Sequence, residues 1–200
     1  MFWDKVSPVY DFFEVIYNSR VYCNTGKTVA AHMSTNDTVL ECACGTGAIS
    51  QYIASKCKML IATDLSKGML QQAAWKCRKY SNVKFRYADL MHLKCSNARF
   101  DKVVAGNVIH LLDEPEKAVK ELLRVCKPSG KLIIPTYIND EGTQQRKAVI
   151  LLEKLGLQFK REFDFQSYQQ FFHDIGFPDA EYQIVKGKMP CAIAVITKKG

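Results

Sequence analysis

The stretch from Val39 to Ser50 constrains the fold of this chain more than any other. It opens with apolar residues, passes the acid Glu41, turns through Gly45 and Gly47, and continues with apolar residues at helical spacing. This order predicts a strand, a glycine turn and a helix. Glycine adopts positive φ readily and lets a ligand approach the backbone closely. The sequence therefore predicts a ligand site at this turn.

Two classes of ligand use such a turn, and Glu41 helps to separate them. A dinucleotide fingerprint requires a third glycine, whose position here is occupied by Ser50. A carboxylate at the end of a buried strand needs a partner, and it suits a cationic ligand group better than a pyrophosphate. The helix after the turn is expected to point its first N–H groups toward the ligand. An ordinary strand-to-helix turn without a ligand is the alternative.

The turn resembles the first motif of the class I S-adenosylmethionine (SAM) methyltransferases. That motif reads acid-x-Gly-x-Gly-x-Gly, and here Ala43 replaces the first glycine. Small-molecule members of the family, including the quinone-biosynthesis C-methyltransferases, look similar at this point. The resemblance implies SAM as the cofactor. The motif residues that it assigns to SAM binding are Glu41, Cys44, Gly45, Thr46 and Gly47.

A second acid, Asp64, follows the continuous apolar run 59–63. Such a run suits a parallel strand that is buried on both faces. An acid roughly 20 residues past the glycines can accept hydrogen bonds from two ribose hydroxyls. The resemblance assigns Asp64 and Leu65 to the SAM ribose and places Met69 against the adenine. Simple core packing is the alternative for Met69.

Two later segments resemble the third and fourth motifs of the same family. Asp89 and Leu90 follow the predicted strand 83–87, and the resemblance places them at the adenine. Asn107 follows the predicted strand 100–105, and it is expected near the methionine end of SAM. The Asn-Pro-Pro-Tyr-like form that acts on nucleobase amino groups is absent from the sequence. This favours a small-molecule methyl acceptor over a nucleic acid.

His110 and Tyr10 are the candidate catalytic residues, and each has a structural alternative. His110 follows the fourth-motif segment and could take a proton from the substrate. Tyr10 lies in a Val-Tyr-Asp segment like the one that many small-molecule methyltransferases carry before the first motif, where it would cover SAM. A packed helix-start histidine and a helix-start aromatic are the alternatives. A base is needed only if the acceptor arrives protonated.

Composition bounds the remaining possibilities. The 200 residues include eight cysteines and carry a net charge of +8. The cysteine spacing lacks a zinc pattern, so we expect reduced thiols and no metal. The basic residues are spread along the chain, which favours a solvated surface. No apolar run is long enough to span a membrane and the start lacks a secretory pattern, so we expect a cytoplasmic protein.

The order of predicted elements indicates an α/β protein with a Rossmann-like, seven-stranded, mostly parallel sheet. One strand is antiparallel, because the last two strands are joined by a short connection, and helices cover both faces. We expect a single methyltransferase domain over residues 1–200. Its expected parts are an N-terminal helical cover (1–35) of two helices interrupted over residues 18–26, a SAM-binding core (36–138), a lid insertion (139–163) with an amphipathic helix over residues 144–155, and a C-terminal helix with a β-hairpin (164–200). Ser167, with Gln170 three residues on, is a capping-box signature for the C-terminal helix.

The sequence thus predicts a SAM-dependent methyltransferase that acts on a small molecule. A lipid or quinone methyltransferase at a membrane surface is an alternative that suits the positive charge. A SAM-binding module without catalysis is another. A nucleotide-dependent oxidoreductase is less favoured, because it would need a third glycine in the turn and a sixth parallel strand, and the sequence supplies neither. The sequence leaves open the identity of the acceptor, the methylated atom and the oligomeric state.

Overall fold

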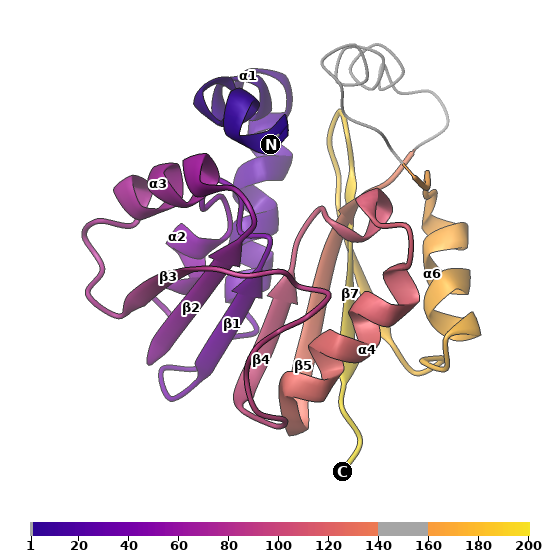
Figure 1. The fold of residues 1–200 in the computed structure, drawn as a ribbon. Coiled ribbons are helices and arrows are strands. Elements are labelled where there is room, and N and C mark those ends of the chain that lie inside the picture. The colour runs from indigo at the N-terminus through magenta and orange to yellow at the C-terminus, as the bar shows by residue number, and fades with distance from the viewer. Residues whose placement is uncertain (1, 140–159) are drawn as a thin grey trace.

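The computed structural model describes residues 2–139 and 160–200, apart from the side chains of residue 2 and of residues 5–17. Seven strands form one sheet in the order β3-β2-β1-β4-β5-β7-β6 (Figure 1). The strands are β1 (Thr38–Cys42), β2 (Met59–Asp64), β3 (Val83–Tyr87), β4 (Phe100–Ala105), β5 (Cys126–Tyr137), β6 (Glu181–Val185) and β7 (Cys191–Thr197).

Helices connect and cover the strands. They are α1 (Phe2–Ala30), α2 (Ser50–Ile53), α3 (Lys67–Lys76), the 3₁₀ turn η1 (Ile109–Leu111), α4 (Pro115–Val125) and α6 (Phe165–Asp174). The first five strands run parallel, and β7 runs antiparallel to both β5 and β6. This confirms the predicted mostly parallel sheet with one antiparallel strand.

Alternation along the central strands builds two apolar cores, one on each face of the sheet. On β5, Leu132 and Ile134 belong to one core and Ile133 to the other. The first core includes residues of α4 and α6, and the second includes residues of α1, α2 and α3. Successive strand side chains point to opposite faces, so apolar residues at every central position require cover on both sides. Figure 1 shows α3 and α4 on opposite sides of the sheet.

The strand order places the expected ligand site. Strand order reverses between β1 and β4, which are direct neighbours in the sheet. In open α/β sheets, ligands bind at such a switch point, outside the carboxyl ends of the strands. Glu41 on β1 and the segment that begins at Gly106 after β4 flank this point.

The N-terminal helix differs from the prediction. We expected residues 18–26 to break the helix, whereas α1 runs through them with a kink at Asn18 (φ −137°). The buried side chains of Val21 and Val29 hold this second part of α1 against the sheet. The Tyr52 ring packs against Gly26 and leaves no room for a side chain there, because a Cβ on residue 26 would lie only 2.2 Å from the ring. Tertiary packing outweighs the low helix propensity of glycine here.

The predicted capping box near α6 is shifted by one turn. The sequence suggested Ser167 as the N-cap, with Gln170 as its partner. In the structure Asp164 is the N-cap, and its carboxylate accepts from the Ser167 backbone N–H at 2.7 Å. Ser167 occupies the N3 position, and its hydroxyl oxygen accepts a hydrogen bond from the Asp164 N–H. A box of Asp and Ser is satisfied by the same backbone donors as one of Ser and Gln.

Most of the predicted lid insertion (139–163) lies outside the described residues, which resume at Lys160. So does the helix expected over residues 144–155. Within the described part of the chain, no helix combines the length and the apolar character needed to cross a membrane.

Candidate functional site

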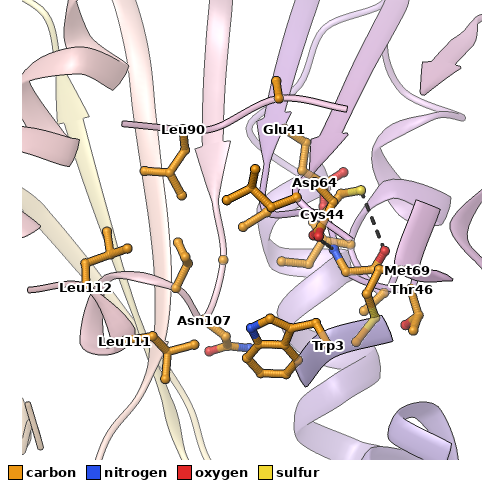
Figure 2. A pocket seen from close by; sticks show the side chains of 18 of the residues that line it. Trp3, Glu41, Cys44, Thr46, Asp64, Met69, Leu90, Asn107, Leu111 and Leu112 are labelled. Carbon is orange, nitrogen blue, oxygen red and sulfur yellow. Dashed lines mark hydrogen bonds between the residues drawn. The ribbon is translucent and has the colours of Figure 1, made fainter. Parts of the chain in front are cut away.

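A cavity of about 470 Å³ opens at the switch point of the sheet (Figure 2). It is lined by the glycine turn after β1, the loops after β2, β3 and β4, and two stretches of α1. Ten of the eleven residues predicted to bind the cofactor line it: Glu41, Cys44, Gly45, Thr46, Asp64, Leu65, Met69, Asp89, Leu90 and Asn107. The exception is Gly47.

Glu41 is the buried acid of the cavity. Its side chain is only 2% exposed, and its Oε2 accepts a hydrogen bond of 2.6 Å from the Ser50 hydroxyl of α2. Burial raises the pKa of Glu41 to about 8, and the nearby Asp64 adds to this effect. The ligand-free site therefore holds Glu41 mostly protonated at neutral pH, and a cationic group placed beside it would favour ionisation.

The structure confirms the predicted order of strand, glycine turn and helix, but the helix is shorter than expected. It spans only Ser50–Ile53, and the N–H of Gly47 donates to the Cys44 carbonyl at 2.9 Å. That donor is used within the turn, so a full helix N-terminus does not face the cavity. Gly47 instead has a packing role, because a Cβ added there would lie 3.0 Å from the Ala73 Cα of α3.

Ala43 stands where the family motif has its first glycine, and the structure places it at φ +51°. A side chain in this left-handed region costs roughly 1–2 kcal/mol relative to glycine. We predict that Ala43→Gly raises the free energy of unfolding by about 1 kcal/mol, after the entropy cost of glycine is subtracted. Urea unfolding measures this change.

The matched control for this variant is Ala74→Gly. Ala74 is exposed on α3, where glycine is expected to lower stability by about 0.5–1 kcal/mol. If Ala43→Gly were destabilising to the same extent as Ala74→Gly, the left-handed conformation at residue 43 would be wrong.

Asp64 lies at the end of β2 and ties three segments together. Its Oδ2 accepts from the Gly45 N–H at 2.9 Å, and its Oδ1 accepts from the Ser66 N–H at 2.8 Å. The Ser66 hydroxyl caps α3 by accepting from the Met69 N–H, and it donates to the Asp4 carboxylate at 2.6 Å. Asp4 thus anchors the start of α1 beside the loop that follows Asp64.

Apolar and weakly polar groups form the wall beyond Asp64. Met69 and Leu90 are both buried and both line the cavity. The Cys44 thiol is buried as well, and burial raises its pKa well above the ordinary value, so it remains a neutral thiol. Asp89 also lines the cavity, and one of its oxygens accepts from the Met91 N–H at 2.8 Å. Its second oxygen lies 3.4 Å from His92 Nδ1.

Asn107 is held in an uncommon backbone conformation at the end of β4. Its φ is +52°, a region that asparagine tolerates better than most residues. The Asn107 N–H donates to the Pro135 carbonyl at 2.8 Å, and its side-chain oxygen accepts from the Tyr137 N–H at 3.1 Å. The side chain points into the cavity (Figure 2).

Of the two candidate catalytic residues, the structure describes the side chain of His110 but not that of Tyr10. His110 lies in η1 and is buried, and it is not one of the described residues that line the cavity. Burial lowers its pKa to about 4, which makes it a weak base at neutral pH. The backbone of Tyr10 lies in α1, but its side chain is outside the described residues. Both roles remain predictions.

Sequence reasoning missed several cavity residues, which come from α1, from η1 and the residue after it, and from the end of β5. They are Trp3, Tyr22, Thr25, Leu111, Leu112 and Tyr137. Figure 2 shows Trp3 reaching into the cavity from the start of α1. Tyr22 and Thr25 lie in the segment that we had expected to be non-helical. Their spacing of three residues on one helix face was the available signal.

A comparison with family models gives one match. Residues 40–134 match the family described as a methyltransferase domain. Over these residues, just under half of the chain, the protein is similar to that family. The strand order and the cavity at the β1–β4 switch point agree with this similarity.

Relatives support the same family. The chain is 30% identical over 135 residues to a demethylmenaquinone methyltransferase of Clavibacter sepedonicus, covering 66% of this chain and 55% of that protein. A demethylmenaquinone methyltransferase of Lactiplantibacillus plantarum is 27% identical over 90% of this chain and 88% of its own length. The chain spans about half the length of several curated relatives that it matches.

Among solved structures, a SAM-dependent methyltransferase of Thermotoga maritima superposes with a TM-score of 0.75. It is 19% identical, and the match covers 99% of both chains. At this level of identity, the similarity establishes the fold of the methyltransferase domain.

Proposed function

We propose that the protein transfers a methyl group from SAM to a small-molecule acceptor. The observation that carries this proposal is the meeting of two acids, Glu41 and Asp64, in one cavity at the switch point of the sheet. The charges of the residues that line the cavity support SAM over a dinucleotide as the ligand. The described lining residues include three acids and no lysine or arginine, a poor environment for a pyrophosphate.

The lining residues fit each part of SAM. The Asp64 carboxylate suits the two ribose hydroxyls, and the buried Glu41 suits the cationic amino group. Met69 and Leu90 offer an apolar wall for the adenine, which Asp89 can bind through the exocyclic amine. These assignments follow from chemistry and position, and each is open to mutation.

When bound, SAM supplies an electrophilic methyl group on its sulfonium. The residues of this chain then have to orient the two reactants and exclude water. Correct orientation alone can contribute on the order of 7–11 kcal/mol to lowering the barrier. The tethers from Asn107 to β5 and from Asp64 to the glycine turn fix the walls of the cavity. Trp3 covers the cavity from the start of α1.

We further propose an apolar or aromatic acceptor. The cavity residues not assigned to SAM include Trp3, Val108, Leu111, Leu112 and Tyr137. These side chains bury planar or aliphatic groups well and offer little to a charged acceptor. The relatives named as demethylmenaquinone methyltransferases support a quinone-like acceptor for this chain.

The proposal is tested by titrating the purified protein with SAM and, separately, with NADH in a calorimeter. We expect SAM to bind with micromolar affinity and NADH not to bind. A panel of phenols, quinols, amines and thiols then identifies the acceptor by methyl transfer. A folded protein that binds no SAM would refute the proposal, and binding without transfer to any acceptor would favour the non-catalytic module.

SAM binding is expected to release about one proton near neutral pH. The pKa of Glu41 in the ligand-free protein is about 8, so the carboxyl is mostly protonated at pH 7. A bound ammonium group lowers that pKa, and the proton leaves. Affinity should therefore rise between about pH 6 and about pH 7, by about tenfold per pH unit at most. Calorimetry in two buffers with different ionisation enthalpies counts the protons.

Glu41→Gln is the control for this prediction. It keeps a hydrogen-bond partner for Ser50 but cannot titrate. We expect it to bind SAM more weakly and without proton release. Equal binding enthalpies of the unmodified protein in both buffers at pH 7 would contradict the assignment of Glu41 to the ammonium group.

The same raised pKa has a consequence for stability without ligand. Because the pKa of Glu41 is higher in the folded than in the unfolded chain, its contribution is fully present below the unfolded value of 4.5. That contribution is lost as the pH rises through about 8.

A further inference from the structure

The connection from β3 to β4 has no secondary structure of its own, although it contributes to the cavity. Helices follow β1, β2 and β4, whereas residues 88–99 contain neither helix nor strand. Asp89 and Leu90, near the start of this loop, line the cavity. A segment without helix or sheet bonds needs other partners to keep one conformation. The groups that hold the loop therefore bear on the position of Asp89.

One arginine of α4 supplies those partners. The guanidinium of Arg124 donates to the Leu93 carbonyl and to the Cys95 carbonyl, both at 2.9 Å. It also donates to the side-chain oxygen of Asn97 at 2.6 Å. The Arg124 carbonyl accepts from the Ala98 N–H at 3.0 Å. The second half of the loop is thus bonded at four points to a single residue of α4.

Glu121, one turn earlier on α4, holds this guanidinium. Its carboxylate oxygens accept from Arg124 Nε at 2.7 Å and from Nη2 at 2.8 Å, and one of them also accepts from the Leu93 N–H at 2.8 Å. The Glu121 and Arg124 side chains are only 18% and 32% exposed. Hydrogen bonding from the guanidinium lowers the pKa of Glu121, so the pair is ionised at neutral pH. A bidentate, partly buried pair is stronger and better defined than an exposed one.

The bonded half of the loop continues directly from the turn that carries Asp89. The Asp89 carbonyl accepts from the His92 N–H at 3.1 Å, and its Oδ1 accepts from the Met91 N–H at 2.8 Å. Leu90 and Leu93 are buried in the same apolar core. The bonds from α4 begin at Leu93, immediately after this turn. They therefore fix where the turn, and with it the Asp89 carboxylate, stands at the cavity.

We propose that Arg124, held by Glu121, is a positioning residue for Asp89 and thereby sets a preference for adenine over other purines. Neither Arg124 nor Glu121 is among the described residues that line the cavity, so both act through the loop. This inference rests on the proposed function, in which Asp89 binds the exocyclic amine of the adenine. A purine with oxygen in place of that amine offers the carboxylate no donor there, and the two oxygens repel each other.

The test measures two affinities by calorimetry. The ligands are S-adenosylhomocysteine, which is SAM without its methyl group, and S-inosylhomocysteine, in which oxygen replaces the exocyclic amine. We expect the unmodified protein to bind the adenine ligand about 10-fold more tightly or better, the size of one hydrogen bond to a charged group. Arg124→Met removes the guanidinium but keeps a long side chain. It should lower the affinity for the adenine ligand by about 10-fold and leave the affinity for the other nearly unchanged.

Two further variants separate geometry from charge. Arg124→Lys keeps the positive charge, but a single ammonium cannot span Glu121 and the oxygens of the loop, so the selectivity should stay reduced. Lys117→Met is the matched control. Lys117 also pairs with an acid three residues earlier, Glu114 at 2.5 Å, rather than with the loop. Its replacement should leave both affinities as they are in the unmodified protein.

Hydrogen exchange shows whether the change is local. In ligand-free Arg124→Met we expect faster amide exchange over residues 89–97, while β1 and β4 keep their protection. If Arg124→Met does not fold, Glu121→Gln gives the same test. It keeps the shape of the side chain but loses the charge that holds the guanidinium, and its selectivity should fall in the same direction.

Each outcome bears on one claim. If folded Arg124→Met loses affinity for both ligands equally, or for neither, the positioning role is refuted and the proposed function stands. If the unmodified protein binds the two ligands equally, Asp89 does not read the amine and the inference is wrong. If the unmodified protein binds neither ligand, the proposed function fails and the inference falls with it.

Discussion

Asp64→Ala is expected to lower the affinity for SAM by about 100-fold or more. The carboxylate is proposed to accept hydrogen bonds from both ribose hydroxyls, and each bond to a charged group contributes about 1.5–3 kcal/mol. Since 1.4 kcal/mol corresponds to about a factor of ten in affinity, losing both bonds accounts for this loss. The same change also releases the Gly45 and Ser66 N–H groups that Asp64 now holds.

Two further variants sharpen this measurement. Asp64→Asn keeps one acceptor oxygen and should lose only about 10-fold in affinity. Asp179→Ala removes an exposed acid that pairs with Lys199 at 3.0 Å, outside the cavity, and should bind SAM normally. Calorimetry gives the affinities, and melting curves show whether the variants are folded. An unchanged affinity in folded Asp64→Ala would overturn the assignment of the second motif.

Gly47→Ala is expected to destabilise the fold by about 2–4 kcal/mol. Two costs add at this residue. Its φ of +81° disfavours a side chain, and an added Cβ would lie 3.0 Å from the Ala73 Cα, where backbone must move. Urea unfolding measures the loss, and we expect α3 to shift away from the glycine turn.

Gly176→Ala isolates the first of these costs. Gly176 has a φ of +96°, but an added Cβ there would have no atom within 4 Å. Its replacement should therefore cost only about 1–2 kcal/mol. Equal losses in the two variants would show that the contact with Ala73 contributes nothing, and that Gly47 is retained for its backbone conformation alone.

Much of the fold could be predicted because short segments of the sequence carry the signals for the individual strands and their connections. Runs such as 59–62 are apolar at every position, which requires cover on both faces of the sheet and hence favours parallel strands with helices between them. The short connection between β6 and β7 dictated the antiparallel strand. Where a local signal competed with packing, prediction failed. Residues 18–26 carry poor helix formers, yet Val21 and Val29 pack on the sheet and hold them helical.

The sequence by itself determined the acids and glycines of the site, since Glu41, Gly45 and Asp64 stand at strand ends where topology alone brings them together. Only the tertiary structure decided the protonation of Glu41, because its pKa depends on how completely neighbouring elements exclude water. The same is true of the places of Tyr22 and Thr25 in the cavity. Their helical spacing can be read in the sequence, but only the packing of α1 beside α3 brings them to the cavity.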